Sequence, residues 1–391
     1  MASDSKPGSL WFDAHLDLAC LAVCGRDLAR PIAGVVGPFA PGCVSLPDLR
    51  AAGVRFALGT IFIEQVDAEK SAAGITPEQY LQGDVEGASR RGRAQMEVYQ
   101  SWRDAGLIKL DFPECLRIDP GVGEIRGGMG VSEVRPESLA RKSAAVAASD
   151  AALHMGILVE GADSIRSPDE LPWWVERGVI ACGLAWAKNS RYAMGNSVAP
   201  DVAVGLTDLG REMVGCLDSL GIVHDLSHLS QRATDDLLAL TNQAVVATHS
   251  NCRELLGGEL EGKNQRHLRD ETIREIDRRG GIIGLNLFGL FLRKAPPHKG
   301  PGRPSIDDAI RHVERICDLL GHKRSVGLGS DMDGGFGSDA MCVGIERPQH
   351  LARLAETLEA RGWTADEIAG FTHLNWLRFW SRRCRDSAVK V

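Results

Sequence analysis

The chain has 391 residues, of which 44% are hydrophobic and 25% are charged, so a sizeable apolar core can form without disulfide bonds. The formal net charge of -7, without any basic run interleaved with aromatic residues, argues against nucleic acid as a partner. No apolar run approaches the roughly 20 residues of a membrane span, so we expect no membrane partner either.

The N-terminal residues MASDSKPGSLWFDAH lack the basic start, the apolar run and the small-residue cleavage site of an export signal. The ten cysteines are scattered, mostly among apolar neighbours, and include no C-x-x-C pair. We therefore interpret them as reduced core residues of a cytoplasmic protein. Cys20 and Cys24 could form a soft metal site, but no second pair of cysteines supports this alternative.

Eight short apolar runs, most of them followed by a segment with helical periodicity, predict repeated βα units. In chain order they are Leu10–Leu18, Arg55–Ile63, Met155–Gly161, Val179–Trp186, Ile222–Ser227, Ala244–His249, Gly281–Leu287 and Ser325–Ser330. A helix over 206–220 is predicted from the cap residue Thr207 and from Gly221 at its end, and two more are predicted over 270–279 and 306–320. Eight parallel strands joined by helices predict an α/β fold, the (β/α)8 TIM-type barrel; an open doubly wound sheet is the alternative.

The one long departure from this pattern is the segment 77–150, between the second and third predicted strands. A helix over 86–105 is predicted there, followed by two short strand-like runs around 107–110 and 115–118 and by the glycine-rich sequence GVGEIRGGMG. The segment lacks an apolar core of its own. We therefore interpret it as an insertion into one domain that spans residues 1–391.

Acidic residues and histidines stand at the carboxyl ends of the predicted strands, where barrels of this type place their active sites. On the first strand two such residues are two positions apart, so their side chains point to the same face. From the first strand to the eighth, the residues are His15, Asp17, Glu160, His228, His249 and Asp331. Burying several polar groups at one barrel mouth is costly, and metal coordination is the simplest reason to keep them all.

Imidazole and carboxylate groups without a thiolate favour zinc, with manganese, cobalt or iron as substitutes. The set suits two cations, with Glu160 as the natural bridge. A lone histidine on an apolar strand is more often a satisfied core residue, and we interpret His224, which lies deeper in the barrel, as structural. The histidines that precede a strand or lie in helices and loops are interpreted as surface or packing residues: His154, His298, His312, His322, His350 and His373.

The order of the motifs along nearly the whole chain resembles the membrane (renal-type) dipeptidases, peptidase family M19, a zinc peptidase family that includes soluble bacterial members. The matching pieces are DAHLD, EGAD, DLSH, THS, QRHLRD, GGIIGLNL, GLGSDMDG and HLNWLRF. The resemblance implies that one zinc ion is held by His15, Asp17 and Glu160. It implies that Glu160 also holds the second ion, together with His228 and His249.

The resemblance also implies the roles of further residues. Arg266 matches the family residue that binds the carboxylate of the substrate, for which a planar guanidinium is suited. Asp331 matches an acid that moves a proton from the metal-bound water to the leaving amine, so it is a catalytic residue beside the bridging Glu160. Where the family has T-H-x-x-N, this chain has LAWAKNS: Trp186 replaces the substrate-binding histidine, and Asn189 is kept. An indole donates one hydrogen bond but cannot become a cation, so the departure affects the substrate more than the reaction.

The sequence therefore predicts a metal-dependent dipeptidase that contains two zinc ions and hydrolyses a small dipeptide with a free C-terminal carboxylate. One alternative is the same chemistry on another carboxylated amide, such as an N-acyl amino acid or a lactam. The other is a metal-binding relative without turnover. The expected partner is a small dipeptide-like molecule, and barrels of this kind commonly form homodimers.

Overall fold

The computed structural model describes residues 10–33, 37–67, 69, 74–117, 124–126, 132–134, 136–149, 152–257 and 265–388. Six parallel strands form one sheet, in the order β1-β2-β7-β8-β9-β10, and β11 pairs with β12. Their bounds are β1 (Trp11–Leu16), β2 (Val54–Phe62), β7 (His154–Glu160), β8 (Val179–Gly183), β9 (Val223–Asp225), β10 (Val245–Val246), β11 (Ile283–Leu285) and β12 (Val326–Leu328). Each of the eight predicted runs thus overlaps a strand, although most strands are shorter than predicted.

The parallel sheet curls back on itself. A parallel bridge between Ala247 and Ile283 links the β10 and β11 segments. At the other edge, the backbone N–H of Ser330, just after β12, donates to the side chain of Asp13 on β1 at 2.8 Å. The last strand is therefore held against the first, and the fold is α/β with a curled parallel sheet.

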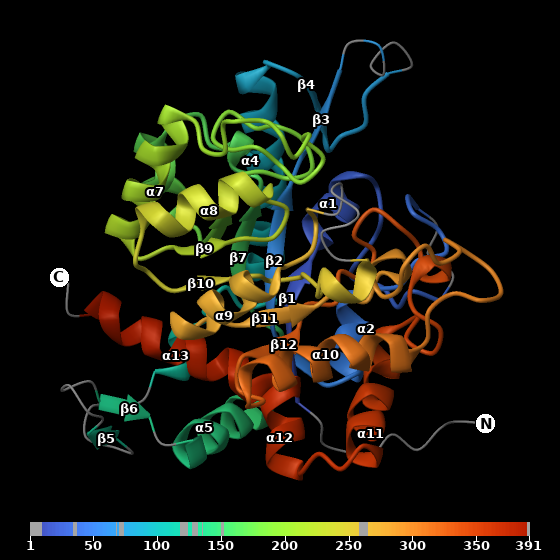
Figure 1. Cartoon of the computed structure of the whole chain (residues 1–391). Coiled ribbons are helices and arrows are strands. Elements are labelled where there is room, and N and C mark those ends of the chain that lie inside the picture. Colours follow the sequence, from blue (N-terminus) through green and yellow to red (C-terminus); the bar gives the residue numbers. More distant parts are fainter. Residues whose placement is uncertain are drawn as a thin grey trace.

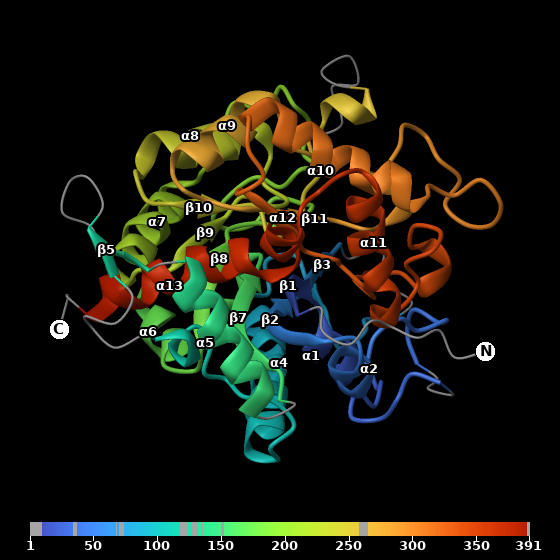
Figure 2. The ribbon, with the colours of Figure 1, turned by 90° about the horizontal axis from the view of Figure 1, so that it is seen from below.

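Helices surround the strands (Figures 1 and 2). They are α1 (Leu18–Val23), α2 (Leu46–Ala51), α4 (Val85–Asp104), α5 (Pro136–Ser149), α6 (Leu171–Val175), α7 (Asp208–Leu220), α8 (Gln231–Leu240), α9 (Asp270–Arg278), α10 (Ile306–Leu320), α11 (Ala352–Ala360), α12 (Ala365–Ala369) and α13 (Asn375–Ala388). The side chain of Thr207 accepts a hydrogen bond from Gly210 N at 3.0 Å, and Gly221 ends α7 with a φ of 71°. Both predicted caps of this helix are confirmed. No helix within the described ranges combines the length and the apolar character that crossing a membrane requires.

The segment 77–150 contains several elements, preceded by the short strand β3 (Glu64–Val66), which pairs with β4 (Gln79–Leu81). Helix α4 buries Met96 and Tyr99 in the main core, so it acts as the crossover between β2 and β7. The glycine-rich sequence lies largely outside the described residues, but its strand β5 (Glu124–Arg126) pairs with β6 (Ser132–Val134).

The two strand-like runs predicted after α4 are not strands. Lys109, in the first run, makes only an isolated bridge to His154. The second is wrong as a strand prediction over its described residues, because Glu114–Leu116 form a 3-10 turn; its last residue, Ile118, lies outside the described residues. Local bonds satisfy the backbone there: Leu116 N donates to the carbonyl of Pro113 at 2.9 Å, and a proline has no N–H of its own to offer a neighbouring strand.

Aromatic residues close the amino ends of the strands, where α13 crosses the bottom of the molecule (Figure 2). Trp376 stacks on Phe12 of β1, with ring centroids 5.5 Å apart, and its indole N–H donates to Leu328 O at 3.0 Å. A Cβ on Gly327 would lie 2.5 Å from the indole nitrogen, so this approach requires glycine. The amino ends of the strands are thus packed with apolar side chains, and the polar residues predicted for the site stand at the opposite, carboxyl ends.

Candidate metal centre

The five predicted metal ligands lie together at the carboxyl ends of the strands. One is on β1 and one directly after it, one is the last residue of β7, and the other two follow β9 and β10. All five are at most 9% exposed: His15, Asp17, Glu160, His228 and His249. The curl of the sheet thus brings together side chains that are far apart in the sequence. Their assignment as ligands stays a prediction.

Glu160 stands between two sets of these groups. Its Oε2 lies 3.3 Å from His15 Nε2, and the same nitrogen lies 4.0 Å from Asp17 Oδ1. Its Oε1 lies 3.2 Å from His228 Nε2 and 3.3 Å from His249 Nε2. A carboxylate whose two oxygens face separate ligand sets has the arrangement of a bridge between two cations.

The second set has the donor chemistry of a cation site. His228 Nδ1 lies 3.0 Å from the amide oxygen of Asn196, which can only accept, so this ring carries its proton on Nδ1. Burial lowers the pKa of His228 to about 4 and that of His249 well below its usual value, so both rings are neutral. Their Nε2 atoms lie 2.9 Å apart and both face Glu160 Oε1. Three electron-pair donors this close together fit a divalent cation such as zinc.

The first set carries an excess of negative charge. Burial lowers the pKa of His15, but the carboxylates of Glu160, Asp17 and Asp331 outweigh it and raise this pKa to about 10. Burial and the charge of Glu160 also raise the pKa of Asp17 to about 6, against the opposing effect of His15. Surroundings that hold a proton on a buried imidazole this strongly also favour a metal cation in its place.

Asp331 lies beside the first set. Its backbone has a φ of 59°, in the left-handed region, and its N–H donates to the carbonyl of His15 at 3.3 Å. Asn286 Nδ2 donates to its Oδ2 at 2.8 Å. Burial raises the pKa of Asp331 to about 8 despite the opposing charge of His15, with Asp17 adding to the rise. A carboxyl group that exchanges its proton near neutral pH suits proton transfer.

Arg266, the predicted carboxylate clamp, is buried behind His249. Its guanidinium donates to Ser250 Oγ at 2.9 Å and to His249 O at 2.8 Å. Its Nε has no hydrogen-bond partner among the residues that the structure describes. Two of the three guanidinium nitrogens are therefore used inside the protein, and the clamp role stays a prediction.

A cavity of about 480 Å³ opens over the cluster, and Asp17, Glu160, His228 and Asp331 form part of its lining. Much of the remaining wall is aromatic: Phe39, Phe62, Trp186, Phe288, Phe291 and Phe336. The ring of Trp186 meets that of Phe62 edge-on, with centroids 5.0 Å apart. His298, predicted as a surface or packing residue, also lines the cavity. Asn189 is exposed and is not among the lining residues.

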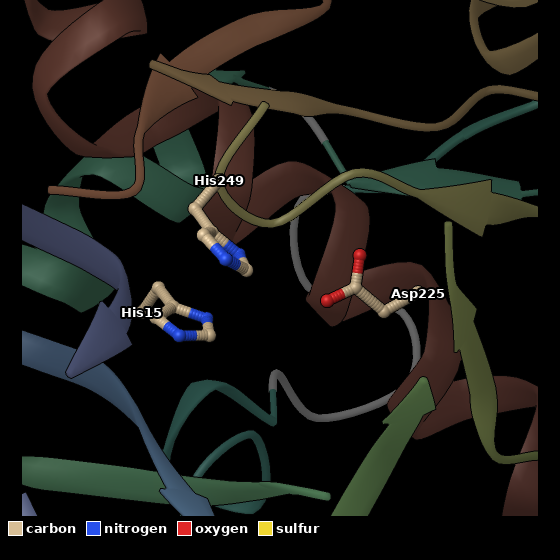
Figure 3. Close-up of side chains that lie close together, drawn as sticks. All are labelled: His15, Asp225 and His249. Atoms are coloured by element: carbon tan, nitrogen blue, oxygen red, sulfur yellow. The ribbon is translucent and has the colours of Figure 1, made fainter. Parts of the chain in front are cut away.

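The structure adds supporting residues that the sequence analysis missed. The hydroxyl of Thr60 bonds to Asp17, and that of Thr248 bonds to Asp225. In Figure 3, Asp225 lies opposite His15 and His249. Asp225 and Thr248 could have been noticed from their places in DLSH and THS, next to predicted ligands. Thr60 and Asn196 stand in no such motif, so their contacts appear only in the folded chain.

Comparisons with known proteins place the chain in a family. The model of "Membrane dipeptidase (Peptidase family M19)" matches residues 134–388. An uncharacterised dipeptidase of Schizosaccharomyces pombe is 32% identical over 179 residues, which are 46% of this chain and only 40% of that protein. An uncharacterised protein in the pqqA 5′ region of Klebsiella pneumoniae is 29% identical over 240 residues, 59% of this chain and 82% of that protein.

Solved structures share the fold. A metallopeptidase of Rhodobacter sphaeroides, liganded with a phosphinate mimic of L-Ala-D-Ala, has a TM-score of 0.68 at 23% identity over 96% of this chain and 99% of its own. The family M19 dipeptidase AC has a TM-score of 0.67 at 22% identity, covering 96% and 100%. An amidohydrolase of Pseudomonas aeruginosa has 0.62 at 16%, covering 96% of each chain. Because the family model matches well over half of the residues, the chain belongs to the membrane dipeptidase family, peptidase family M19, as its motifs predict.

Proposed function

We propose that this chain is a two-zinc dipeptidase that hydrolyses the amide bond of a small dipeptide with a free C-terminal carboxylate. The observation that carries the proposal is Glu160, whose two oxygens face separate sets of ligand-type side chains at the base of a cavity. Membership of family M19 supports the reaction class. The dipeptide mimic bound to the Rhodobacter sphaeroides relative supports the substrate class.

The residues of the chain divide the work of hydrolysis. Bound zinc ions would lower the pKa of a water molecule and polarise the scissile carbonyl. Asp331, oriented by Asn286, would take up the proton of the attacking water and return it to the leaving nitrogen. Arg266 would hold the far carboxylate and so fix the amide bond over the cluster, which makes the attack effectively intramolecular. Trp186 would contact the substrate from the cavity wall.

We further propose that the eight strands close into one (β/α)8-barrel domain over residues 1–391. The Ala247–Ile283 bridge and the bond from Ser330 N to Asp13 support closure on either side of the β11–β12 pair. The segment 77–150 is then an insertion between the second and third barrel strands that also contains the crossover helix α4.

The aromatic wall favours a second candidate, hydrolysis of an N-acyl amino acid or a lactam with a free carboxylate. An apolar acyl group could be buried against the rings of Phe62, Phe288 and Phe336. Trp186 favours the same candidate, because an indole packs well against apolar groups but cannot supply the positive charge of an imidazolium.

A substrate panel with metal analysis tests these proposals. We expect two zinc ions per chain, hydrolysis of dipeptides that a chelator abolishes and zinc restores, and slower turnover of N-acyl amino acids. Faster turnover of the N-acyl compounds would favour the second candidate. Bound zinc without hydrolysis of any compound would identify a relative that has lost turnover, and a wild-type chain that binds no metal would overturn the proposal.

The clamp has a separate test. Arg266→Lys should raise the KM for dipeptides while kcat changes little, because a point charge replaces a planar fork. Steady-state kinetics with a dipeptide and with its C-terminal amide measure this, since the amide lacks the carboxylate. An unchanged KM for the dipeptide would place the clamp elsewhere.

A further inference from the structure

We propose that the hydroxyl of Thr248, held by Asp225, is a positioning group that orients one histidine of each zinc set at the same time. The inference rests on the proposed function, because it assumes that His15 and His249 bind zinc through Nε2. It concerns the other ring nitrogen, Nδ1, of these two histidines.

The hydroxyl of Thr248 has three partners and is completely buried. Its oxygen lies 2.5 Å from Asp225 Oδ2, 3.0 Å from His249 Nδ1 and 3.3 Å from His15 Nδ1. A hydroxyl has one proton to donate and two lone pairs that accept, so these three contacts use its full capacity. Figure 3 shows its three partners, with the rings of His15 and His249 on one side and the carboxylate of Asp225 on the other.

The direction of these hydrogen bonds follows from Asp225. Its Oδ1 accepts the backbone N–H groups of Ser227 and Thr248, each at 3.0 Å, which turns Oδ2 towards the Thr248 hydroxyl, and a carboxylate oxygen has no proton to donate. The Thr248 hydroxyl therefore donates its proton to Oδ2. Its oxygen can then only accept, so His15 and His249 must both carry a proton on Nδ1.

A proton on Nδ1 leaves Nε2 as the metal-binding nitrogen of each ring, and both Nε2 atoms face Glu160. The two rings also stack, with centroids 3.5 Å apart and planes 28° apart, so neither can turn without the other. One hydroxyl thus fixes a ligand on each side of the bridging carboxylate.

The same cluster could be read as a third metal site, because ligand atoms of His15, Asp225 and His249 lie within 4.8 Å of one another. The hydroxyl oxygen of Thr248, however, lies within hydrogen-bonding distance of all three. The centre of the cluster is therefore taken by a protein atom. This favours a hydrogen-bond hub over a site for an ion.

Thr60 provides a matched control. It is also a completely buried threonine, and its hydroxyl donates to the carboxylate of Asp17. Asp17 belongs only to the first set, whereas Thr248 touches a member of each. If the hub acts as proposed, Thr248→Val weakens both zinc sites and Thr60→Val weakens one.

The experiment measures zinc affinity of the metal-free full chain by competition with a chromogenic chelator. We expect Thr248→Val to bind both ions about 10–100-fold more weakly, as is typical when a partner of a metal ligand is removed. Thr248→Ser keeps the hydroxyl and should bind as wild type does. Wild-type affinity at either site in Thr248→Val, or equal weakening in Thr248→Ser and Thr248→Val, would overturn the inference.

Asp225→Asn tests the hydrogen-bond direction and serves if Thr248→Val does not fold. In this variant the two backbone N–H groups would keep the side-chain oxygen in place, so the amide nitrogen of the asparagine would donate to the Thr248 oxygen. The hydroxyl proton of Thr248 would then point at one of the two histidine rings. That ring must move its proton to Nε2, so zinc affinity should fall at one site at least; unchanged affinity at both sites would overturn the inference. Wild-type protein that binds two zinc ions without cleaving dipeptides would contradict the proposed function alone.

Discussion

The two ends of strand β7 both carry groups that could bind a metal, yet they differ in charge and burial. At its start, His154 Nδ1 lies 2.7 Å from Asp111 Oδ1, and Cys115 lies close by. At its end, Glu160 faces three histidines. The side chain of Asp111 is 42% exposed, whereas that of Glu160 is 6% exposed.

This difference shows that proximity of ligand-type residues does not by itself make a metal site. At the start of β7, a single carboxylate faces one imidazole and is partly exposed, so solvent can compensate its charge without an ion. At the end, Glu160, Asp17 and Asp331 are buried together, and the guanidinium of Arg266 balances at most one of their charges, so a cation or bound protons must balance the rest. Buried charge without internal balance is therefore what distinguishes the candidate metal centre.

The largest effect is expected from Glu160→Gln. The amide loses the negative charge and one of the two acceptor oxygens that face the ligand sets, so both zinc ions should be lost and hydrolysis should fall to background. Elemental analysis of the purified variant and a dipeptide assay measure this. If the variant retains two ions, Glu160 is not the bridge, and the proposed difference in metal binding between the two ends of β7 is wrong.

Asp331→Asn should give the next largest effect. The amide cannot transfer the proton, so kcat should fall by about 10²–10⁴-fold while the zinc content stays at that of wild type. Loss of zinc in this variant would show instead that Asp331 is a ligand, which would enlarge the metal centre. Unchanged turnover would remove it from the mechanism.

A buried histidine away from both ends of β7 tests how strongly burial opposes a charge in this protein. His312 accepts the N–H of Cys252 at 3.1 Å, and burial lowers its pKa to about 4, below the usual 6.5. As the pH falls from 6.5 towards 4, the unfolded chain takes up this proton first, so stability present above pH 6.5 is lost, by at most about 3 kcal/mol. In urea unfolding, the free energy of unfolding should fall less over this pH range in His312→Gln than in wild type. Equal falls in the two proteins would show that His312 is not the group that takes up the proton.

The smallest effect is expected at the start of β7. His154→Gln removes the pair with a half-exposed carboxylate, so the free energy of unfolding should fall by about 1–2 kcal/mol while zinc content and kcat stay unchanged. Denaturant unfolding and elemental analysis measure both. A loss of zinc would show that the two ends of the strand are not as different as their burial indicates.

The sequence by itself determined the local features of this protein. Apolar runs predict the eight strands, and a polar residue after a run is predicted at the strand's carboxyl end because that depends only on chain order. Parallel strands then bring His15, Glu160 and His249 to one rim whatever the details of packing. The family motifs follow the same order, so the candidate ligands could be found without a structure.

Only the tertiary structure decided how these groups face one another. Which oxygen of Glu160 meets which histidine depends on how far the sheet curls. The contact between Thr248 and His15 spans 233 positions of the chain, and no local pattern encodes it. The aromatic wall likewise combines Phe39, Trp186 and Phe336 from separate loops. Periodicity reports which face of an element is buried, but not its partner across the core, because that partner is set by the packing of the whole chain.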